Sequence, residues 1–229
     1  GVSSTGPRYR SLHPAFTFDQ FMVGESNILA RSACQALASG DSTFGHCLFM
    51  NSTTGLGKSH LTQAVVHQVL RSAPSTRLHY LTAQQFSAEM VKSIRGNSME
   101  QFSKRYVNDC DMLLVEDVHT LTGKNKTQEE LNTILDYLIK SGRRVILTSA
   151  LAPTKLAGMD EDFRSRMTSG LVTGIQSPVT ILCGVQTFPD LQAAAVRLAQ
   201  VMRDWLRVIE VSSGKLIFEL VPGLAVDPT

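Results

Sequence analysis

The chain has 229 residues, enough for one sizeable hydrophobic core or for one domain with a small appendage. Apolar residues make up 43% of it and charged residues 18%, a balance that excludes an intrinsically disordered chain. The net charge of +2 does not by itself indicate a nucleic-acid binder, so any contact with DNA would need a local basic patch.

Nothing in the sequence points to export or to membrane insertion. No signal peptide is recognisable and the apolar stretches are too short to cross a bilayer, so a cytoplasmic location is expected. The chain does not begin with Met and can be a piece of a longer protein. Buried thiols in a reducing cytosol, rather than disulfides or a zinc site, are expected of the four cysteines: Cys34, Cys47, Cys110 and Cys183.

Two segments precede the first expected strand. Residues 1–10 are rich in Ser, Gly and Arg, which predicts a flexible lead-in. Residues 16–21 alternate aromatic with polar side chains, which predicts an extended segment lying on the core. Ser26 or Asn27 can then cap a helix whose apolar positions are Ala30, Ala33 and Leu37.

Short apolar runs then alternate with helical patterns, which predicts an α/β fold with helices on both faces of a parallel sheet. Helices are expected from Lys58 and from Thr127, where Glu130 completes a capping-box spacing. Two more are expected over residues 83–95 and 99–106, and the strands are expected at residues 47–50, 78–81, 112–115 and 144–148. After residue 179 the pattern changes to one helix over 191–209 and one strand over 215–221, with no chemical motif.

The strongest chemical signal lies between the first expected strand and its helix. In a P-loop, backbone N–H groups surround phosphates, the Lys reaches the β- and γ-phosphates, and the Ser hydroxyl binds Mg²⁺. A Gly-rich turn with a chance Lys is the alternative, and Ser52 stands where the full signature has Gly. The residues expected to bind nucleotide are Thr54, Gly55, Leu56, Gly57, Lys58, Ser59 and His60.

Two further signals follow along the chain. The strand at 112–115 runs into Glu116 and Asp117, one to hold Mg²⁺ through water and the other to activate the attacking water. A solvated acidic turn is the alternative for these two acids. Arg164 and Arg166 could stabilise charge on a phosphoryl group, although surface arginines of this kind are common.

Residues 12–178 together resemble the AAA+ ATPase domain of the DnaA family of bacterial replication initiators. The matching stretches are residues 16–27, 55–61, 113–118, 123–130, 164–166 and 170–171. The resemblance implies a three-layer P-loop NTPase fold with a central parallel sheet and an inserted helix pair at residues 84–106. It divides the chain into a lead-in (1–11), the nucleotide-binding domain (12–178) and an extension of unknown role (179–229).

The resemblance also implies an ATP- and Mg²⁺-dependent initiator that assembles on single-stranded origin DNA, with other replication proteins as further partners. Ser59 and Glu116 would hold Mg²⁺, while Lys58, Asp117 and Arg166 would be catalytic, Arg166 at the nucleotide of a neighbouring subunit. The positions that match DNA-contacting residues are Val91, Lys124 and Lys126; for the two lysines a solvated basic turn is the alternative.

The sequence departs from the family at four places. Ser52, Thr53 and Thr54 replace a Gly-rich loop, Glu116 replaces Asp, and Ala150 replaces a polar sensor. The lid domain and the DNA-reading helix-turn-helix domain are not recognisable after residue 178. These departures predict weak ATP hydrolysis and leave three alternatives: a regulatory adaptor with little turnover, a helicase loader, and a truncated or rearranged gene product.

Overall fold

The computed structural model describes residues 8–176, 206–212 and 215–220. The chain divides into two compact units, one formed by residues 1–23 and 27–176, the other by residues 24–26 and 177–229. None of the described helices is long and apolar enough to cross a bilayer.

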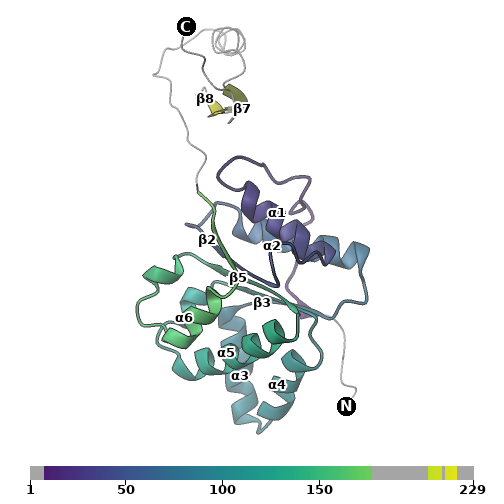
Figure 1. The fold of residues 1–229 in the computed structure, drawn as a ribbon, viewed down its shortest axis with the longest axis vertical. Coiled ribbons are helices and arrows are strands. Elements are labelled where there is room, and N and C mark those ends of the chain that lie inside the picture. The colour runs from purple at the N-terminus through teal and green to yellow at the C-terminus, as the bar shows by residue number, and fades with distance from the viewer. Residues whose placement is uncertain (1–7, 177–205, 213–214, 221–229) are drawn as a thin grey trace. The chain divides into compact units, whose positions relative to one another are not determined.

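A six-stranded sheet forms the centre of the first unit (Figure 1). Its strands lie in the order β1 (Arg8–Tyr9), β3 (Leu78–Thr82), β4 (Met112–Glu116), β5 (Arg144–Ser149), β2 (Cys47–Asn51) and β6 (Leu171–Gly174). All neighbours are parallel, as the sequence predicts. The two edge strands were not predicted, and β1 places part of the expected flexible lead-in within the sheet.

Helices cover both faces of this sheet (Figure 1). One face carries α1 (Ile28–Ser39) and α2 (Lys58–Ser72). The other carries α3 (Ala83–Arg95), α4 (Met99–Val107), α5 (Asn125–Lys140) and α6 (Glu161–Met167). Two short 3₁₀ turns, η1 (Val118–Leu121) and η2 (Pro153–Lys155), complete the unit.

Two hydrophobic cores explain why the central strands are apolar throughout. Leu48 and Leu114 point into the core beneath α1 and α2, with Leu37, Leu61 and Val65. Their strand neighbours Phe49 and Leu113 point into the opposite core, with Phe86, Leu131 and Phe163. Side chains alternate between the faces of a strand, so a strand buried on both faces must be apolar at every position.

Two local predictions were wrong. The segment at residues 16–21 forms turns, with Gln20 N–H donating to Thr17 O, although Phe18 and Phe21 are buried in the core as expected. Thr127 does not cap α5, because the helix begins two residues earlier at Asn125 and Thr127 is buried in its first turn. Asn27 stands at the N-cap of α1 but makes no side-chain cap there.

A close approach between strands requires glycine at position 170. A Cβ atom there would lie 2.1 Å from the carbonyl oxygen of Cys47 on β2, so the backbone would have to move. We expect Gly170→Ala to lower the free energy of unfolding by about 1–3 kcal/mol, measured by urea denaturation. Gly96→Ala is the matched control, because a Cβ there meets nothing closer than 3.4 Å. Equal stability losses in the two variants would contradict the prediction.

The burial predicted for the cysteines is confirmed for the three that the structure describes. Cys34, Cys47 and Cys110 are free and buried. Burial raises the pKa of the Cys47 and Cys110 thiols to about 12, so they remain protonated and unreactive. Cys183 lies outside the described residues.

The second unit contains one described antiparallel pair, β7 (Leu206–Ser212) with β8 (Lys215–Leu220). The strand expected at 215–221 is confirmed as far as residue 220. The helix expected over 191–209 lies outside the described residues up to 205, and its last four positions are strand instead, so that boundary was wrong.

Candidate nucleotide-binding site

The loop between β2 and α2 has the geometry that a phosphate-binding loop requires. Gly55 and Gly57 have φ angles of +90° and +98°, which side-chain-bearing residues rarely adopt. Gly57 is the N-cap of α2, so the positive end of the helix dipole faces the loop. A Cβ atom on Gly57 would also lie 2.7 Å from the ring of Phe21, so a side chain there would have to displace that ring.

Lys58 is buried at the start of α2 and turns back into the loop. Its ammonium donates to Ser52 O at 2.5 Å, to Ser52 Oγ at 3.1 Å and to Thr53 O at 3.0 Å. Burial lowers the pKa of Lys58, and the negative charges of Asp117 and Glu116 oppose that shift. Ser52, which replaces the glycine of the full signature, thus supplies two of the three acceptors that hold the lysine.

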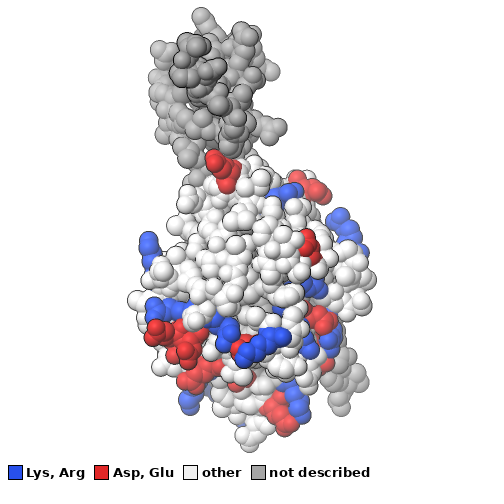
Figure 2. Space-filling model, viewed as in Figure 1, with Lys and Arg blue, Asp and Glu red and all other residues white. Residues whose placement is uncertain are grey.

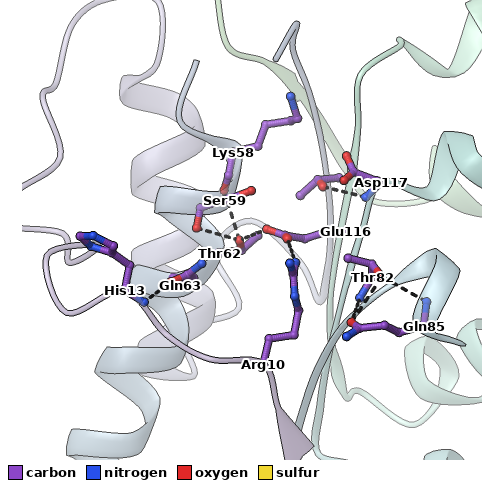
Figure 3. A network of polar contacts seen from close by, with 11 residues as sticks. Arg10, His13, Lys58, Ser59, Thr62, Gln63, Thr82, Gln85, Glu116 and Asp117 are labelled. Atoms are coloured by element: carbon purple, nitrogen blue, oxygen red, sulfur yellow. Dashed lines mark hydrogen bonds and ion pairs between the residues drawn. The ribbon is translucent and has the colours of Figure 1, made fainter. Parts of the chain in front are cut away.

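The two acids after β4 have different surroundings (Figure 3). The Glu116 side chain is only 3% exposed; one oxygen accepts from Thr62 Oγ1 at 2.6 Å and the other from Arg10 Nη1 at 2.5 Å. Asp117 is half-buried with a left-handed φ of +59°, and its backbone N–H donates to Thr148 Oγ1 on β5. The side chain of Asp117 makes no hydrogen bond or ion pair among the described residues.

These oxygens fit the chemistry of a bound magnesium ion. Mg²⁺ prefers oxygen ligands and is usually held by one or two carboxylates, waters and substrate phosphates. The exposed Ser59 lies on the first turn of α2, close in Figure 3 to Thr62 and Glu116. The carboxyl edge of the sheet therefore brings together the predicted lysine, hydroxyl and acids.

His60 links this helix to the aromatic segment that precedes α1. Its ring stacks on Phe16 with centroids 4.7 Å apart and meets Phe21 edge-on at 5.1 Å. Its Nε2 lies 2.8 Å from Thr17 O. Its side chain therefore fixes the turns of residues 16–21 against α2, so a contact of position 60 with phosphate would have to use its backbone N–H.

Sequence reasoning missed four residues around the acids. Thr62 could have been found, because it lies one turn after Lys58 on the face of α2 directed at β4. Thr148 could also have been found, as the polar end of a buried strand. His119, whose Nδ1 accepts from the backbone N–H of Ala150 at 3.2 Å, and Arg10 carry no recognisable motif.

Arg166 lies on α6 and is paired within its own chain. Its Nη2 is 2.6 Å from Oδ1 of Asp136 on α5, and the other oxygen of that carboxylate is 2.7 Å from Lys140 Nζ. Hydrogen bonding from Lys140 and the charge of Arg166 lower the pKa of Asp136. The structure thus places Arg166 with Asp136 rather than with Lys58 or Asp117.

The three residues expected to contact DNA lie on one part of the surface. Val91 on α3 is 42% exposed, and Lys124 and Lys126 at the start of α5 are exposed. Ser87, one turn before Val91, lies 3.4 Å from Thr127 on α5, which brings the two helices together at this point. On the face seen in Figure 2, Lys and Arg are interspersed with Asp and Glu, so this face carries no large basic field.

The sheet order, the glycine-rich loop before α2 and the acids at the end of the adjacent strand define a P-loop NTPase domain of the AAA+ class. A family model described as the bacterial DnaA ATPase domain matches residues 12–174. The chain belongs to this family.

Relatives and solved structures agree with the assignment. The chain is 64% identical over 177 residues to the chromosomal replication initiator protein DnaA of Desulfotalea psychrophila, a match that covers 77% of this chain and 37% of the relative. Domain III of the Thermotoga maritima initiator superposes with a TM-score of 0.70 at 29% identity, covering 86% of this chain and 79% of that one. The chain spans just over a third of the length of its curated relatives.

A second solved structure holds ligands. It is a replication initiator DnaA bound to AMPPCP and single-stranded DNA, with a TM-score of 0.68 and 30% identity over 72% of this chain and 51% of that chain.

Proposed function

We propose that this chain is the ATP-binding domain of a replication initiator, whose nucleotide state controls its assembly on origin DNA. The observation that carries the proposal is the position of Lys58, held by loop oxygens at the N-terminus of α2 with two acids at the adjacent strand end. The domain is proposed to cover residues 12–178. It is proposed to act in the cytoplasm and to have further replication proteins as partners. Residues 179–229 are left without a role.

Each residue of the site then has a task. The backbone N–H groups of residues 54–60 surround the phosphates, and Lys58 leaves Ser52 and Thr53 to neutralise the β- and γ-phosphates. Ser59 and Glu116 hold Mg²⁺, which offsets phosphate charge when bound. Asp117, whose carboxylate is not engaged by any described residue, orients or deprotonates the attacking water.

Arg166 is proposed to act on the nucleotide of a neighbouring subunit. Its partner Asp136 belongs to α5 of the same chain, so the guanidinium is not used by its own P-loop. An arginine supplied across a subunit boundary would make turnover depend on assembly.

A regulatory adaptor with little turnover is the second candidate. Ala150 offers no polar side chain after β5, and its backbone N–H is occupied by His119. The carboxylate of Glu116 is already engaged by Arg10 and Thr62. Both features would slow the chemical step without preventing nucleotide binding.

Calorimetry of ATP binding to the purified chain, with turnover measured with and without single-stranded DNA, tests both candidates. ATP binding with turnover that rises on assembly supports the initiator. ATP binding with no turnover under any condition supports the adaptor. A chain that binds no nucleotide contradicts both.

Single-stranded DNA is the proposed nucleic-acid ligand, contacted by Val91, Lys124 and Lys126. Lysines follow a phosphate backbone without reading sequence, so binding should be salt-sensitive and sequence-tolerant. We expect the double substitution Lys124→Ala, Lys126→Ala to weaken binding of ATP-loaded protein to all strands. It should also flatten the salt dependence, while ATP affinity stays unchanged.

Fluorescence anisotropy across a salt series measures this effect. The matched control removes two exposed lysines elsewhere, Lys104 and Lys155, and should leave DNA affinity nearly unchanged. Tight binding to one duplex sequence that the Lys124, Lys126 double variant retains would contradict the prediction.

A further inference from the structure

The N-terminal edge of the sheet reaches into the nucleotide site through one side chain. Strand β1 pairs in parallel with β3, with Arg8 opposite His79 and Tyr9 opposite Tyr80. Arg10 follows directly, and its guanidinium lies 5.7 Å from the centroid of the Tyr80 ring. From there its Nη1 reaches Oε2 of Glu116 at 2.5 Å (Figure 3).

This contact compensates a buried negative charge. The side chain of Glu116 is 3% exposed, and an isolated carboxylate at such a position would be strongly unfavourable. Thr62 donates one hydrogen bond to it but carries no charge. Arg10 therefore supplies the compensating positive charge, and its own 37% exposure leaves it partly hydrated.

The compensation acts at the position proposed to face Mg²⁺. A cation is attracted by the net charge of its surroundings, and an arginine in contact with a carboxylate cancels most of that attraction. Asp117 keeps its charge uncompensated by any ion pair among the described residues. Of the two acids, Asp117 alone therefore faces the loop without an ion pair to any described residue, while the ammonium of Lys58 acts on both carboxylates.

We propose that Arg10 is a positioning residue. Its positive charge neutralises Glu116 and thereby lowers the affinity of the nucleotide site for Mg²⁺. The inference rests on the proposed nucleotide site and adds to it a residue from outside the P-loop and the strand that carries the acids. On this inference, the short strand β1 serves to place Arg10 next to Glu116.

The experiment compares ATP affinity with and without Mg²⁺ at pH 8 for the full chain and its Arg10→Gln variant. A fluorescent ATP analogue serves as the probe, titrated in excess EDTA and at a series of Mg²⁺ concentrations. We expect Arg10→Gln to lower the Mg²⁺ concentration for half-maximal binding roughly three- to tenfold, because Glu116 then attracts the cation unopposed. Arg10→Lys keeps the charge and should resemble the parent.

Two controls separate this effect from general changes. Arg71→Gln removes the same charge from an exposed position at the far end of α2 and should leave the Mg²⁺ dependence unchanged. In a Glu116→Gln background, Arg10→Gln should have a smaller effect on it, because the partly exposed guanidinium is no longer held beside the site by an ion pair. A structural role of Arg10 alone would not produce this pattern.

Arg10→Met covers the case in which the Gln variant does not fold, because it keeps an apolar stem beside Tyr80 without the charge. The inference is overturned if the folded neutral variant needs the same Mg²⁺ concentration for half-maximal binding as the parent, or a higher one. That result leaves the proposed function intact. A parent chain that binds no nucleotide overturns both.

Discussion

Replacing Lys58 by alanine is expected to lower the affinity for ATP about a hundredfold. Charge-assisted hydrogen bonds contribute roughly 1.5–3 kcal/mol each, and the ammonium would reach two phosphates. Alanine is a good helix former, so α2 can still begin at this position. Isothermal calorimetry with ATP and Mg²⁺ measures the change directly.

The control must separate loss of phosphate contacts from loss of the loop itself. Lys58 also ties Ser52 and Thr53 together, so thermal unfolding of the variant should be recorded beside its affinity. Lys155→Ala removes an exposed lysine from η2 and should bind ATP like the parent. ATP affinity that survives Lys58→Ala would remove the basis for the P-loop assignment.

The second large effect is expected for Asp117→Asn. Asparagine keeps the shape and tolerates the left-handed backbone at this position, where φ is +59°. It loses the charge needed to activate water, so any turnover should fall by about two to four orders of magnitude. ATP affinity should stay close to that of the parent, which distinguishes this variant from Lys58→Ala.

Steady-state phosphate release, measured at saturating ATP with single-stranded DNA present, checks this expectation. Asp109→Asn is a suitable control, because the Asp109 carboxylate pairs with Arg77 at the opposite end of β4. Equal turnover in the parent and in Asp117→Asn would show that Asp117 is not catalytic and would favour the adaptor.

The central layers of the fold could be predicted because each buried strand carries its own signal. Strands β2 and β4 are apolar at successive positions, a pattern imposed by burial on both faces. The edge strands have no such signal: β1 has two residues, and β6 is mostly not buried. The start of α5 was misplaced because Thr127 and Glu130 imitate a capping box, while Thr127 is in fact buried next to Ser87.

The candidate site likewise has a part that the sequence predicts and a part that it does not. Lys58, Glu116 and Asp117 follow from local order along the chain, since parallel strands bring their carboxyl ends to one edge. The ion pair between Arg10 and Glu116 joins residues 106 positions apart and depends on the pairing of an edge strand. The pairing of Arg166 with Asp136 likewise depends on how α6 packs against α5. No spacing rule within a single chain reveals contacts of this kind.

The pairing of Arg166 with Asp136 bears on the entropy of assembly. A free arginine side chain loses roughly 2 kcal/mol of rotamer entropy when it is immobilised. Arg166 is already restrained at 2.6 Å from Asp136 within one chain, so part of that loss occurs during folding. Docking of a second subunit would then exchange one anionic partner, the carboxylate of Asp136, for another, the phosphate. The free-energy cost that remains when Arg166 changes partner is mainly electrostatic. The affinity of an association that engages Arg166 should therefore respond more strongly to ionic strength than to temperature.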